Sequence, residues 1–436
     1  MYRVITKKLV EWKNGKRRKP LIVRGARQIG KTWSIEHFGK SNYAHLHKID
    51  FEKRPDIHSL FEGNLDPKVI VAHLELLLNR RIDTNNSLVF FDEIQACPKA
   101  LVALRYFYEE MPELHIIAAG SLLEFELSEI SFPVGRVQFI NMYPCTFYEY
   151  LCAIDKEMLA NKLHEKPTRL PDAIHEALLF ELKNYFFIGG MPEAVKVYAE
   201  SGSMMDAFEV QLEIVDTFRQ DFSKYAPYSD KRCLNMVLNS VAAMVGEQIK
   251  YSRLAEGFSN PTIHKAFDLL EHARVVRKIY SISHVGFPLG AVCSDKRFKA
   301  TVLDIGLMQS LAHLSVGNEL QHTELLAIYR GKLAEQFVAQ ELLASQNSDL
   351  FYWSRSARGS TAEVDFLIEK GDGIIPLEVK SGKGGSLRSM HIMLKKYEAC
   401  QLGVVLYSGK FTECANQRLR FVPLYYAGAL AEVVEA

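Results

Sequence analysis

The sequence predicts a multidomain α/β protein, and three features of the chain lead to this prediction. From Leu21 to about Ile140, short apolar runs alternate with stretches of helical character, which is typical of parallel strands joined by helices. Residues 227–285 carry a helix-turn-helix pattern, and a further α/β unit runs from about Ile328 to the end. With 436 residues, 48% of them hydrophobic and 24% charged, the chain can form several globular domains.

Composition and charge narrow the class of protein. The formal net charge is +1, so overall charge gives no argument for nucleic acid, although a local basic patch would not show in the sum. The seven cysteines form no CxxC pair, which favours reduced thiols over a disulfide framework or a zinc site. Residues 1–20 lack the apolar segment of a signal peptide, and no apolar run approaches the ~18 residues of a membrane helix. We therefore expect a cytoplasmic protein without a membrane partner.

Three apolar runs in the first region predict buried parallel strands. LIVR begins at Leu21, LVFF at Leu88 and HIIAA at His115. Each run is short and almost continuously apolar, as expected for strands that are covered on both faces. A segment rich in aromatic residues, NMYPCTFYEYL, follows, and the sequence is then mostly helical to about Ala226.

The middle of the chain predicts a helix, a turn, a second helix and a strand within residues 251–280. We expect Asn260 as the N-cap of the second helix and Pro261 at its first helical position. Basic residues that suit DNA phosphates lie on or after the second helix: Lys265, Arg274, Arg277 and Lys278. This pattern predicts a module that binds duplex DNA, and a module that binds another protein is the alternative. Residues 286–325 are expected to form a connector.

Residues Gly25 to Thr32 read GARQIGKT, the complete G-x-x-x-x-G-K-[ST] pattern of a phosphate-binding loop. The loop follows the strand LIVR and precedes a predicted helix, which is the context that the motif requires. Lys31 suits the β- and γ-phosphates, and the Thr32 hydroxyl suits Mg²⁺. A chance glycine turn is the alternative. The residues predicted to bind ATP are Gly25, Ala26, Arg27, Gln28, Ile29, Gly30, Lys31, Thr32 and Trp33.

The strand LVFF leads into a pair of acidic residues, Asp92 and Glu93. We expect Asp92 to hold Mg²⁺, partly through water, and Glu93 to polarise the water that attacks the γ-phosphate. Two solvated acids at the end of a strand are the simpler interpretation of this run by itself. The combination with the phosphate loop favours a hydrolytic site.

Two further polar residues are candidates for the same site. Ser121 ends the run HIIAAGS, where it suits a role in orienting the water or contacting the γ-phosphate. A small residue in a turn is an equally good interpretation of Ser121. Arg136, in PVGRV, is a candidate to reach a phosphate as an arginine finger, although solvated arginines are commoner.

Residues 362–380, AEVDFLIEKGDGIIPLEVK, predict a β-hairpin with a two-residue Gly-Asp turn. This register places Asp365 directly opposite Glu378. Because side chains alternate between the faces of a strand, Glu363, Asp365 and Leu367 are expected on one face. The polar face of the hairpin would then carry clustered carboxylates and a lysine.

Such a cluster suits metal-dependent hydrolysis of a phosphodiester. Asp365 and Glu378 are candidate ligands of Mg²⁺ or Mn²⁺, hard cations that take oxygen ligands and activate a bound water. Lys380 is a candidate to position that water or to neutralise developing negative charge. The alternative is an ordinary half-exposed hairpin, in which charged and apolar residues alternate and an opposed Glu and Lys stabilise the pairing.

The ordered motifs resemble a known family, the prokaryotic AAA-type ATPases that carry a C-terminal domain of uncharacterised function. The resemblance covers almost the whole chain. It implies an AAA-type nucleotide site, a winged helix in the middle and a C-terminal restriction-endonuclease-like domain related to the PD-(D/E)XK nucleases. The matching motifs are GARQIGKT, FFDEIQ, AAGSLLEF, VGRV with YPCTFYEYL, GGMPEAV, DIGLM, GKLAEQFVAQEL, and AEVDF with PLEVKSG.

The resemblance also assigns roles to individual residues. Ser121 falls at the sensor position of the family and Arg136 in its Gly-Arg motif, whereas no second sensor arginine is located. The nuclease pattern D…ExK matches Asp365, Glu378 and Lys380. Glu335 is the helix glutamate that would complete the metal-binding set, and Glu341 is the alternative because it lies nearer the middle of the apolar face.

The full interpretation is an ATPase that hydrolyses MgATP and is coupled to a nuclease-like domain that binds or cleaves double-stranded or branched DNA. The cofactors are ATP and Mg²⁺, with a second Mg²⁺ or Mn²⁺ expected in the C-terminal domain. One alternative is a nucleotide-dependent switch that binds a protein partner or a second copy and has an inactive nuclease fold. Another is a DNA-binding regulator in which only the winged helix matters. The predicted domains are an AAA-type core (1–150), a helical lid region (151–226), a winged-helix-like region (227–285), a connector (286–325) and a nuclease-like domain (326–436).

Overall fold

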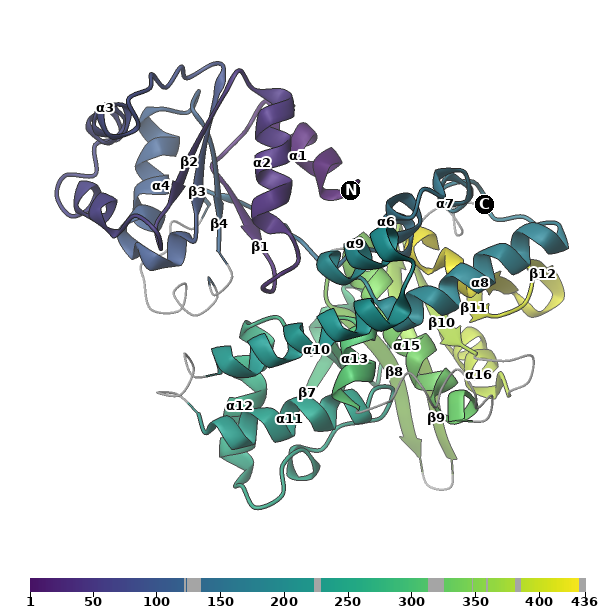
Figure 1. Ribbon diagram of the computed structural model, residues 1–436. Coiled ribbons are helices and arrows are strands. Elements are labelled where there is room, and N and C mark those ends of the chain that lie inside the picture. The colour runs from purple at the N-terminus through teal and green to yellow at the C-terminus, as the bar shows by residue number, and fades with distance from the viewer. Residues whose placement is uncertain are drawn as a thin grey trace. The chain divides into compact units, whose positions relative to one another are not determined.

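The computed structural model describes most of the chain in two compact units. The described residues are 1–120, 123, 135–222, 229–312, 325–346, 348–357, 360–380 and 386–430. One unit comprises Tyr2–Tyr143, and the other comprises Pro144–Ala436 together with Met1. Both contain a β-sheet with helices packed against it, so the predicted multidomain α/β class is confirmed (Figure 1).

The first unit contains a five-stranded parallel sheet with the order β2-β3-β4-β1-β5. The three apolar runs form β1, β3 and β4, and the side chains of β3 and β4 are buried throughout. Because β1 and β3 are parallel members of one sheet, the residues that follow them meet at the same edge. The strands are β1 (Leu21–Arg24), β2 (His45–Asp50), β3 (Ser87–Asp92), β4 (His115–Ala119) and β5 (Gln138–Asn141).

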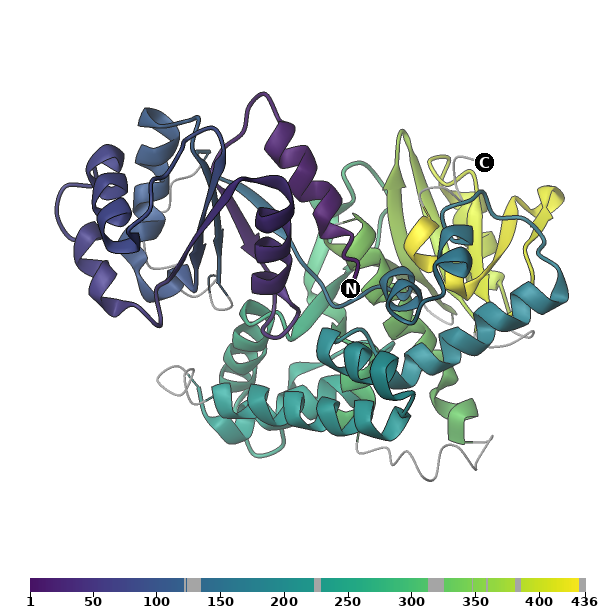
Figure 2. The ribbon, with the colours of Figure 1, turned by 45° about the horizontal axis from the view of Figure 1, so that its top comes forward.

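Helices cover both faces of this sheet. Figures 1 and 2 show α1 and α2 on one face and α3 and α4 on the other. On the second face, Phe51, Phe61 and Phe91 contact one another through tilted and edge-on rings, which fixes the end of β3. The helices are α1 (Ile5–Asn14), α2 (Lys31–Asn42), α3 (Pro67–Leu78) and α4 (Pro98–Glu110), with short 3-10 helices η1 (Pro55–Phe61) and η2 (Ile94–Ala96).

The second unit is built around an eight-stranded mixed sheet with the order β12-β13-β11-β10-β9-β8-β6-β7. Strands β8, β9 and β10 form an antiparallel meander, whereas β10 and β11 are parallel and are joined through α16. The strands are β6 (Val276–Ile282), β7 (Cys293–Val302), β8 (Leu350–Ala357), β9 (Ser360–Lys370), β10 (Gly373–Val379), β11 (Gly403–Tyr407), β12 (Thr412–Cys414) and β13 (Leu419–Pro423).

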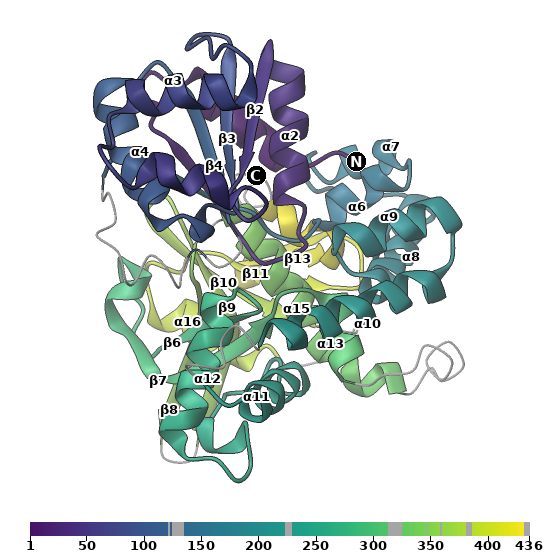
Figure 3. The same cartoon turned by 60° about the vertical axis from the view of Figure 1, so that its left-hand side comes forward.

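Most helices of this unit precede the β8–β9–β10 meander in the sequence. Figure 3 shows α11 and α12 side by side, and α13 also contacts α11. The helices are α6 (Phe147–Ala153), α7 (Glu157–Lys162), α8 (Asp172–Ile188), α9 (Pro192–Ser201), α10 (Met204–Asp221), α11 (Lys231–Ala243), α12 (Asn260–His272), α13 (Ile305–Leu311), α15 (Leu325–Gln346) and α16 (Arg388–Lys396). The 3-10 helices are η3 (Tyr251–Arg253), η4 (Leu289–Val292), η5 (Ala415–Gln417) and η6 (Leu424–Ala429).

Of the elements predicted in residues 251–280, the second helix and the strand are present as α12 and β6, whereas the first helix is only the 3-10 helix η3. The expected N-cap of the second helix was also wrong. Ser259 is the N-cap, and its side chain accepts a hydrogen bond from Thr262 N. Asn260 already belongs to the helix, because the serine oxygen reaches an N–H group at the third helical position. Residues 286–325, expected as a connector, contribute β7 and α13 within their described part.

A buried aspartate ties three separate parts of this unit together. Asp304 caps α13 by accepting hydrogen bonds from Gly306 N and Leu307 N. The same carboxylate accepts from Gly190 N at 2.6 Å and from the Gln340 side chain of α15 at 3.3 Å. The motifs GGMPEAV, DIGLM and GKLAEQFVAQEL therefore meet at one hydrogen-bonded junction.

The hairpin register was predicted correctly, but the alternation of faces along β9 was not. Lys370 pairs with Gly373 and Phe366 with Leu377, as a two-residue turn requires. On the other side of β9, the register shifts between the pairs Trp353–Val364 and Phe351–Leu367. This β-bulge gives β9 one extra residue, so Leu367 packs in the same core as Val364 instead of sharing the face of Asp365.

Candidate functional site

The phosphate loop lies between β1 and α2, in the conformation that its glycines permit. Gly30 is the N-cap of α2 and has φ +85°, while Gly25 has φ +154°. A Cβ atom on Gly25 would lie 2.6 Å from the carbonyl oxygen of Met142, so a larger residue would not fit without movement of the backbone. The loop therefore presents the N-terminus of α2 at the edge of the sheet, where anions bind favourably.

Lys31 is buried and folds back on its own loop. Its Nζ donates hydrogen bonds to the carbonyl oxygens of Gly25 at 2.9 Å and Ala26 at 2.6 Å. The Lys31 ammonium thus donates to backbone carbonyls the hydrogen bonds that it would donate to phosphate oxygens when nucleotide is bound.

An arginine outside the motif supports the loop. Arg3 is buried, and its guanidinium donates to the carbonyl oxygen of Ile29 at 3.0 Å and to that of Tyr143 at 2.6 Å. It links the phosphate loop to the chain that follows β5. Sequence reasoning missed Arg3, because it precedes the motif by more than twenty residues and belongs to no pattern of its own.

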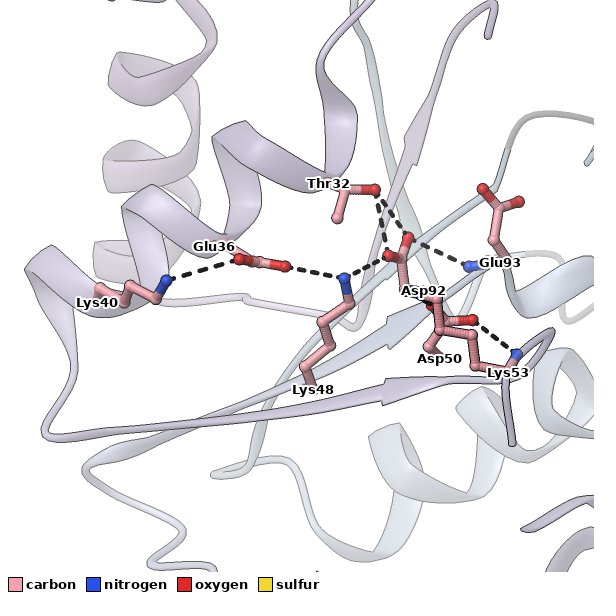
Figure 4. Close-up of polar contacts among 8 residues, drawn as sticks. All are labelled: Thr32, Glu36, Lys40, Lys48, Asp50, Lys53, Asp92 and Glu93. Atoms are coloured by element: carbon pink, nitrogen blue, oxygen red, sulfur yellow. Dashed lines mark hydrogen bonds and ion pairs between the residues drawn. The ribbon is translucent and has the colours of Figure 1, made fainter. Parts of the chain in front are cut away.

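Thr32 and Asp92, predicted to hold Mg²⁺, lie together at the carboxyl edge of the sheet. The Thr32 hydroxyl is 3.1 Å from both carboxylate oxygens of Asp92 (Figure 4). Burial raises the pKa of Asp92, and the hydrogen bonds and charge of Lys48 oppose that rise. A hydroxyl beside a carboxylate is a ligand set that suits Mg²⁺.

Lys48, on β2, is a second residue that sequence reasoning missed. Its ammonium lies 2.9 Å from Asp92 Oδ2 and 2.8 Å from Glu36 Oε1, and Glu36 in turn pairs with Lys40 (Figure 4). Lys48 thus balances the negative charge of Asp92. The parallel pairing of Asp50 with Asp92 brings Lys48 near, and no motif in the sequence carried this register.

Glu93 follows Asp92 in a left-handed backbone conformation, with φ +48°. Its carboxylate lies on the side of Asp92 away from Lys48 (Figure 4). The Gln95 side chain donates to Glu93 Oε2 at 2.5 Å, which holds the carboxylate in place. The positive φ turns Glu93 out of the strand direction, a costly arrangement for a non-glycine residue that is typical of functional sites.

Ser121 and Arg136 are the other two candidates for this site. Ser121 lies outside the described residues. Arg136 precedes β5, and β5 runs parallel to β1 with Gln138 beside Leu21. Arg136 is therefore at the opposite edge of the sheet from the phosphate loop, where its Nε donates to Glu109 Oε1 at 2.8 Å. This placement does not favour contact of Arg136 with its own phosphate loop, and its role as an arginine finger stays a prediction.

In the second unit, Glu335, Glu363 and Asp365 meet around a lysine that sequence reasoning missed. Lys299 Nζ lies 2.6 Å from Glu363 Oε1, 3.4 Å from Glu335 Oε2 and 3.6 Å from Asp365 Oδ1. The Lys299 side chain is only 1% exposed. Burial alone would lower the pKa of Lys299, but the charges of the three carboxylates outweigh it and raise that pKa.

The remaining hairpin candidates adjoin this cluster. Lys380 Nζ donates to Glu378 Oε1 at 2.7 Å, and Val379 N donates to Asp365 Oδ2 at 2.8 Å. Burial, followed by the charge of Asp365, raises the pKa of Glu378. The other oxygen of Glu378 is buried and has no hydrogen-bond partner among the described residues.

The structure distinguishes the two helix glutamates. Glu335 belongs to the cluster around Lys299, whereas Glu341 is buried elsewhere and accepts a hydrogen bond from Phe147 N at 2.9 Å. Burial, followed by the charge of Asp365, raises the pKa of Glu335. Of the two residues weighed from the helical wheel, the structure places Glu335 beside Asp365.

One of the basic residues expected to contact DNA is engaged within the protein. Lys278 is 14% exposed in its side chain, and its ammonium pairs with Asp268 at 3.3 Å and Glu271 at 3.0 Å. Phosphate contact by Lys278 would break these ion pairs, so this residue is a poor candidate for it.

Among the described residues, no group of three or more His, Cys, Asp or Glu side chains is arranged to hold a metal ion. No described helix has both the length and the apolar character needed to cross a membrane.

Comparison with solved structures finds proteins of low identity. The Walker-type ATPase PABY2304 of Pyrococcus abyssi is 14% identical, with 70% of this chain and 94% of that chain covered and a TM-score of 0.45. The RuvB Holliday junction branch migration motor of Thermotoga maritima is 14% identical, with coverage of 68% and 93% and a TM-score of 0.28. The Aeropyrum pernix ORC1 protein in complex with DNA is 11% identical, with coverage of 72% and 92% and a TM-score of 0.27. All three TM-scores are below 0.5.

Family models match three successive parts of the chain. Residues 179–318 match a domain of unknown function, DUF8612, and residues 330–427 match another, DUF4143. No curated protein matches the chain. Residues 17–151 match the AAA domain model, and they contain the phosphate loop and the Thr32–Asp92 pair. Most of the first unit is thus similar to AAA domains.

Proposed function

We propose that the chain binds and hydrolyses MgATP at the edge of the five-stranded sheet. The observation that carries this proposal is the Thr32–Asp92 contact directly beside the N-terminus of α2. It brings together the two halves of a phosphate and magnesium site from β1–α2 and from β3. The chemistry that Mg²⁺ supplies when bound is the neutralisation of phosphate charge.

Each residue of the site has a defined task in this proposal. Lys31 exchanges the carbonyls of Gly25 and Ala26 for phosphate oxygens, which are stronger acceptors because they are charged. Thr32 and Asp92 would hold Mg²⁺, and Lys48 balances the negative charge of Asp92 when no Mg²⁺ is bound. Glu93 accepts a proton from the attacking water, and Gln95 orients its carboxylate.

The roles of Ser121 and Arg136 follow from the family resemblance. Ser121, which follows β4 in the sequence, would orient the attacking water. Arg136 would act on the nucleotide of a second copy of this chain, since it lies at the far edge of its own sheet. ATP turnover would then require an assembly of at least two copies.

For the second unit, we infer a nuclease-like core coupled to the ATPase. The support is the element order α15, β8, β9, β10, α16, β11, with Asp365, Glu378 and Lys380 at the end of the meander and Glu335 on the preceding helix. A second Mg²⁺ or Mn²⁺ would be held by these carboxylates if the core cleaves DNA. The helices α11 and α12 with β6 and β7 would serve as the winged-helix-like part that contacts a duplex.

One observation favours the alternative, a nucleotide-dependent switch that binds a partner without cutting DNA. Lys299 already provides a positive charge at the carboxylates that cleavage would need for a metal ion. A tethered ammonium cannot activate a water as a divalent metal ion does. In this alternative, loss of the γ-phosphate would release or reorder the partner-binding surface.

The magnesium site can be tested with a matched pair of substitutions. Asp92→Asn removes a charge that Mg²⁺ requires, whereas Asp50→Asn changes the neighbouring residue in the same register. We expect Asp92→Asn to lower ATP turnover by about 10- to 150-fold, because a hydrogen bond or contact to a charged group contributes about 1.5–3 kcal/mol. Turnover would be measured across a Mg²⁺ titration. An equal loss in Asp50→Asn, or none in Asp92→Asn, would contradict the assignment.

The activity of the second unit can be tested on labelled duplex, single-stranded and branched DNA with Mg²⁺ or Mn²⁺, with and without ATP. We expect ATP turnover but no cleavage above background, because Lys299 holds the carboxylates. Cleavage that persists in Lys395→Ala, an exposed control, and is lost in Lys380→Ala would overturn this expectation and establish a nuclease. Binding measured over a salt series would show whether DNA phosphates are contacted.

A further inference from the structure

The carboxylates of the second unit converge from different elements onto one buried ammonium. Glu335 comes from α15, Glu363 and Asp365 from β9, and Lys299 from β7. Placing an ammonium at 1% exposure is costly unless several acceptors replace its water. The three contacts of 2.6–3.6 Å supply that replacement.

The carboxylates in turn need a nearby cation, because their negative charges repel one another. Glu335 and Asp365 are only 21% and 14% exposed and share one ammonium, so their negative charges repel one another unless positive charge lies between them. The raised pKa of Glu335, caused by burial and then by Asp365, shows the same crowding. A lysine satisfies such a set better than an arginine, because its three N–H donors diverge from one point and can serve three separate carboxylates.

We propose that Lys299 Nζ is the resident counter-ion of Glu335, Glu363 and Asp365, in the place that a divalent cation would otherwise take among them. This inference rests on the nuclease-like core proposed above and names the cation that the core uses. The charge is tethered to β7, so it is present at every metal concentration. The cluster holds its shape without Mg²⁺ or Mn²⁺.

Two details of the surroundings support a permanent arrangement. Gly246 has φ +81°, and a Cβ atom there would lie 2.9 Å from Glu335 Oε2, so the backbone closes the cluster on that side. The Lys299 ammonium also lies 5.3 Å from the centre of the Tyr352 ring, within the range of a cation–π contact. The lysine is therefore enclosed by an aromatic ring as well as by its carboxylates.

Removing the lysine should convert the cluster into a divalent-cation site. Lys299→Met keeps the unbranched apolar stem of the side chain, one heavy atom shorter, but leaves Glu335, Glu363 and Asp365 without their cation. We expect this variant to unfold at a lower temperature than its parent and to regain stability when Mn²⁺ is added. The parent, whose cluster is already neutralised in part, should not respond to Mn²⁺ in this way.

The experiment uses the full chain with Asp92→Asn in every sample and no nucleotide, so that the first unit does not take up the ion. Mn²⁺ binding would be followed by electron paramagnetic resonance, and unfolding by calorimetry. We expect about one additional Mn²⁺ per chain in Lys299→Met and a saturable rise of its Tm. Lys332→Met is the matched control, because Lys332 pairs with Glu247 outside the cluster. It should gain no ion.

Two outcomes would overturn the proposal: the parent takes up Mn²⁺ as readily as Lys299→Met, or Lys299→Met gains neither the ion nor stability from it. If Lys299→Met does not fold, the double variant Lys299→Met/Glu363→Gln removes one charge of each sign. It should recover folding, and failure to do so would also count against the counter-ion role. Neither readout uses ATP turnover or DNA cleavage, so this role and the proposed function can fail separately.

Discussion

Glu93→Gln should abolish ATP turnover while leaving ATP binding intact. The substitution keeps the size of the side chain and its contact with Gln95, but an amide cannot accept a proton from water. General-base catalysis contributes roughly 100- to 10,000-fold, so the rate should fall by about that factor. Turnover would be measured by phosphate release, and binding by titration with a fluorescent ATP analogue.

The control for this variant is Glu52→Gln, which changes an exposed glutamate just beyond β2. It should hydrolyse ATP at the rate of the unaltered protein. If Glu93→Gln retained more than a tenth of that rate, Glu93 would not be the residue that activates water, and the pairing with Gln95 would be structural. If it lost binding as well, its effect would lie in folding of the loop.

Lys31→Ala should instead weaken nucleotide binding. Lys31 is buried against its own loop at the first residue of α2, and in the proposed site its Nζ binds the phosphates. A hydrogen bond to a charged group contributes about 1.5–3 kcal/mol, which corresponds to about 10- to 150-fold in affinity. Calorimetric titration with MgATP measures this change directly.

Lys40→Ala is the comparison for Lys31→Ala, because Lys40 lies on the same helix and is largely exposed. It should bind MgATP normally. Lys31→Met separates loss of charge from loss of volume, and it should bind as weakly as Lys31→Ala. Unchanged affinity in both Lys31 variants would exclude the loop as the nucleotide site, whatever the turnover of the protein.

The sequence was most informative where function is written in contiguous residues. The phosphate loop and the acids after β3 belong to short motifs, and parallel strands must bring their carboxyl ends to one edge. The contact between Thr32 and Asp92 follows from this rule. Lys48 and Arg3 carry no motif, and their positions beside the site arise from strand register and from the path of the chain before β1.

The same limit explains which features of the second unit could be predicted from the sequence. The hairpin register followed from the Gly-Asp turn, because a two-residue loop fixes which residues pair. The bulge in β9 was not predictable from period-two alternation, since it depends on the pairing with β8. Lys299 was missed because it lies on β7, which is separated from β9 in the sheet by two other strands.

The order of strands in the large sheet has a consequence for how the protein is made. Its strands β6 and β7 fall within the region that matches one family model, and β8 onwards fall within the next, yet β6 pairs directly with β8. A chain leaving the ribosome can complete its first sheet once Asn141 has emerged, because all five strands precede that point. The β6–β7 hairpin, in contrast, keeps an unpaired edge until residues 350–353 are synthesised, and such an edge is a template for association with other chains. Protection of this nascent edge, by a chaperone or by rapid translation, would govern the yield of native protein.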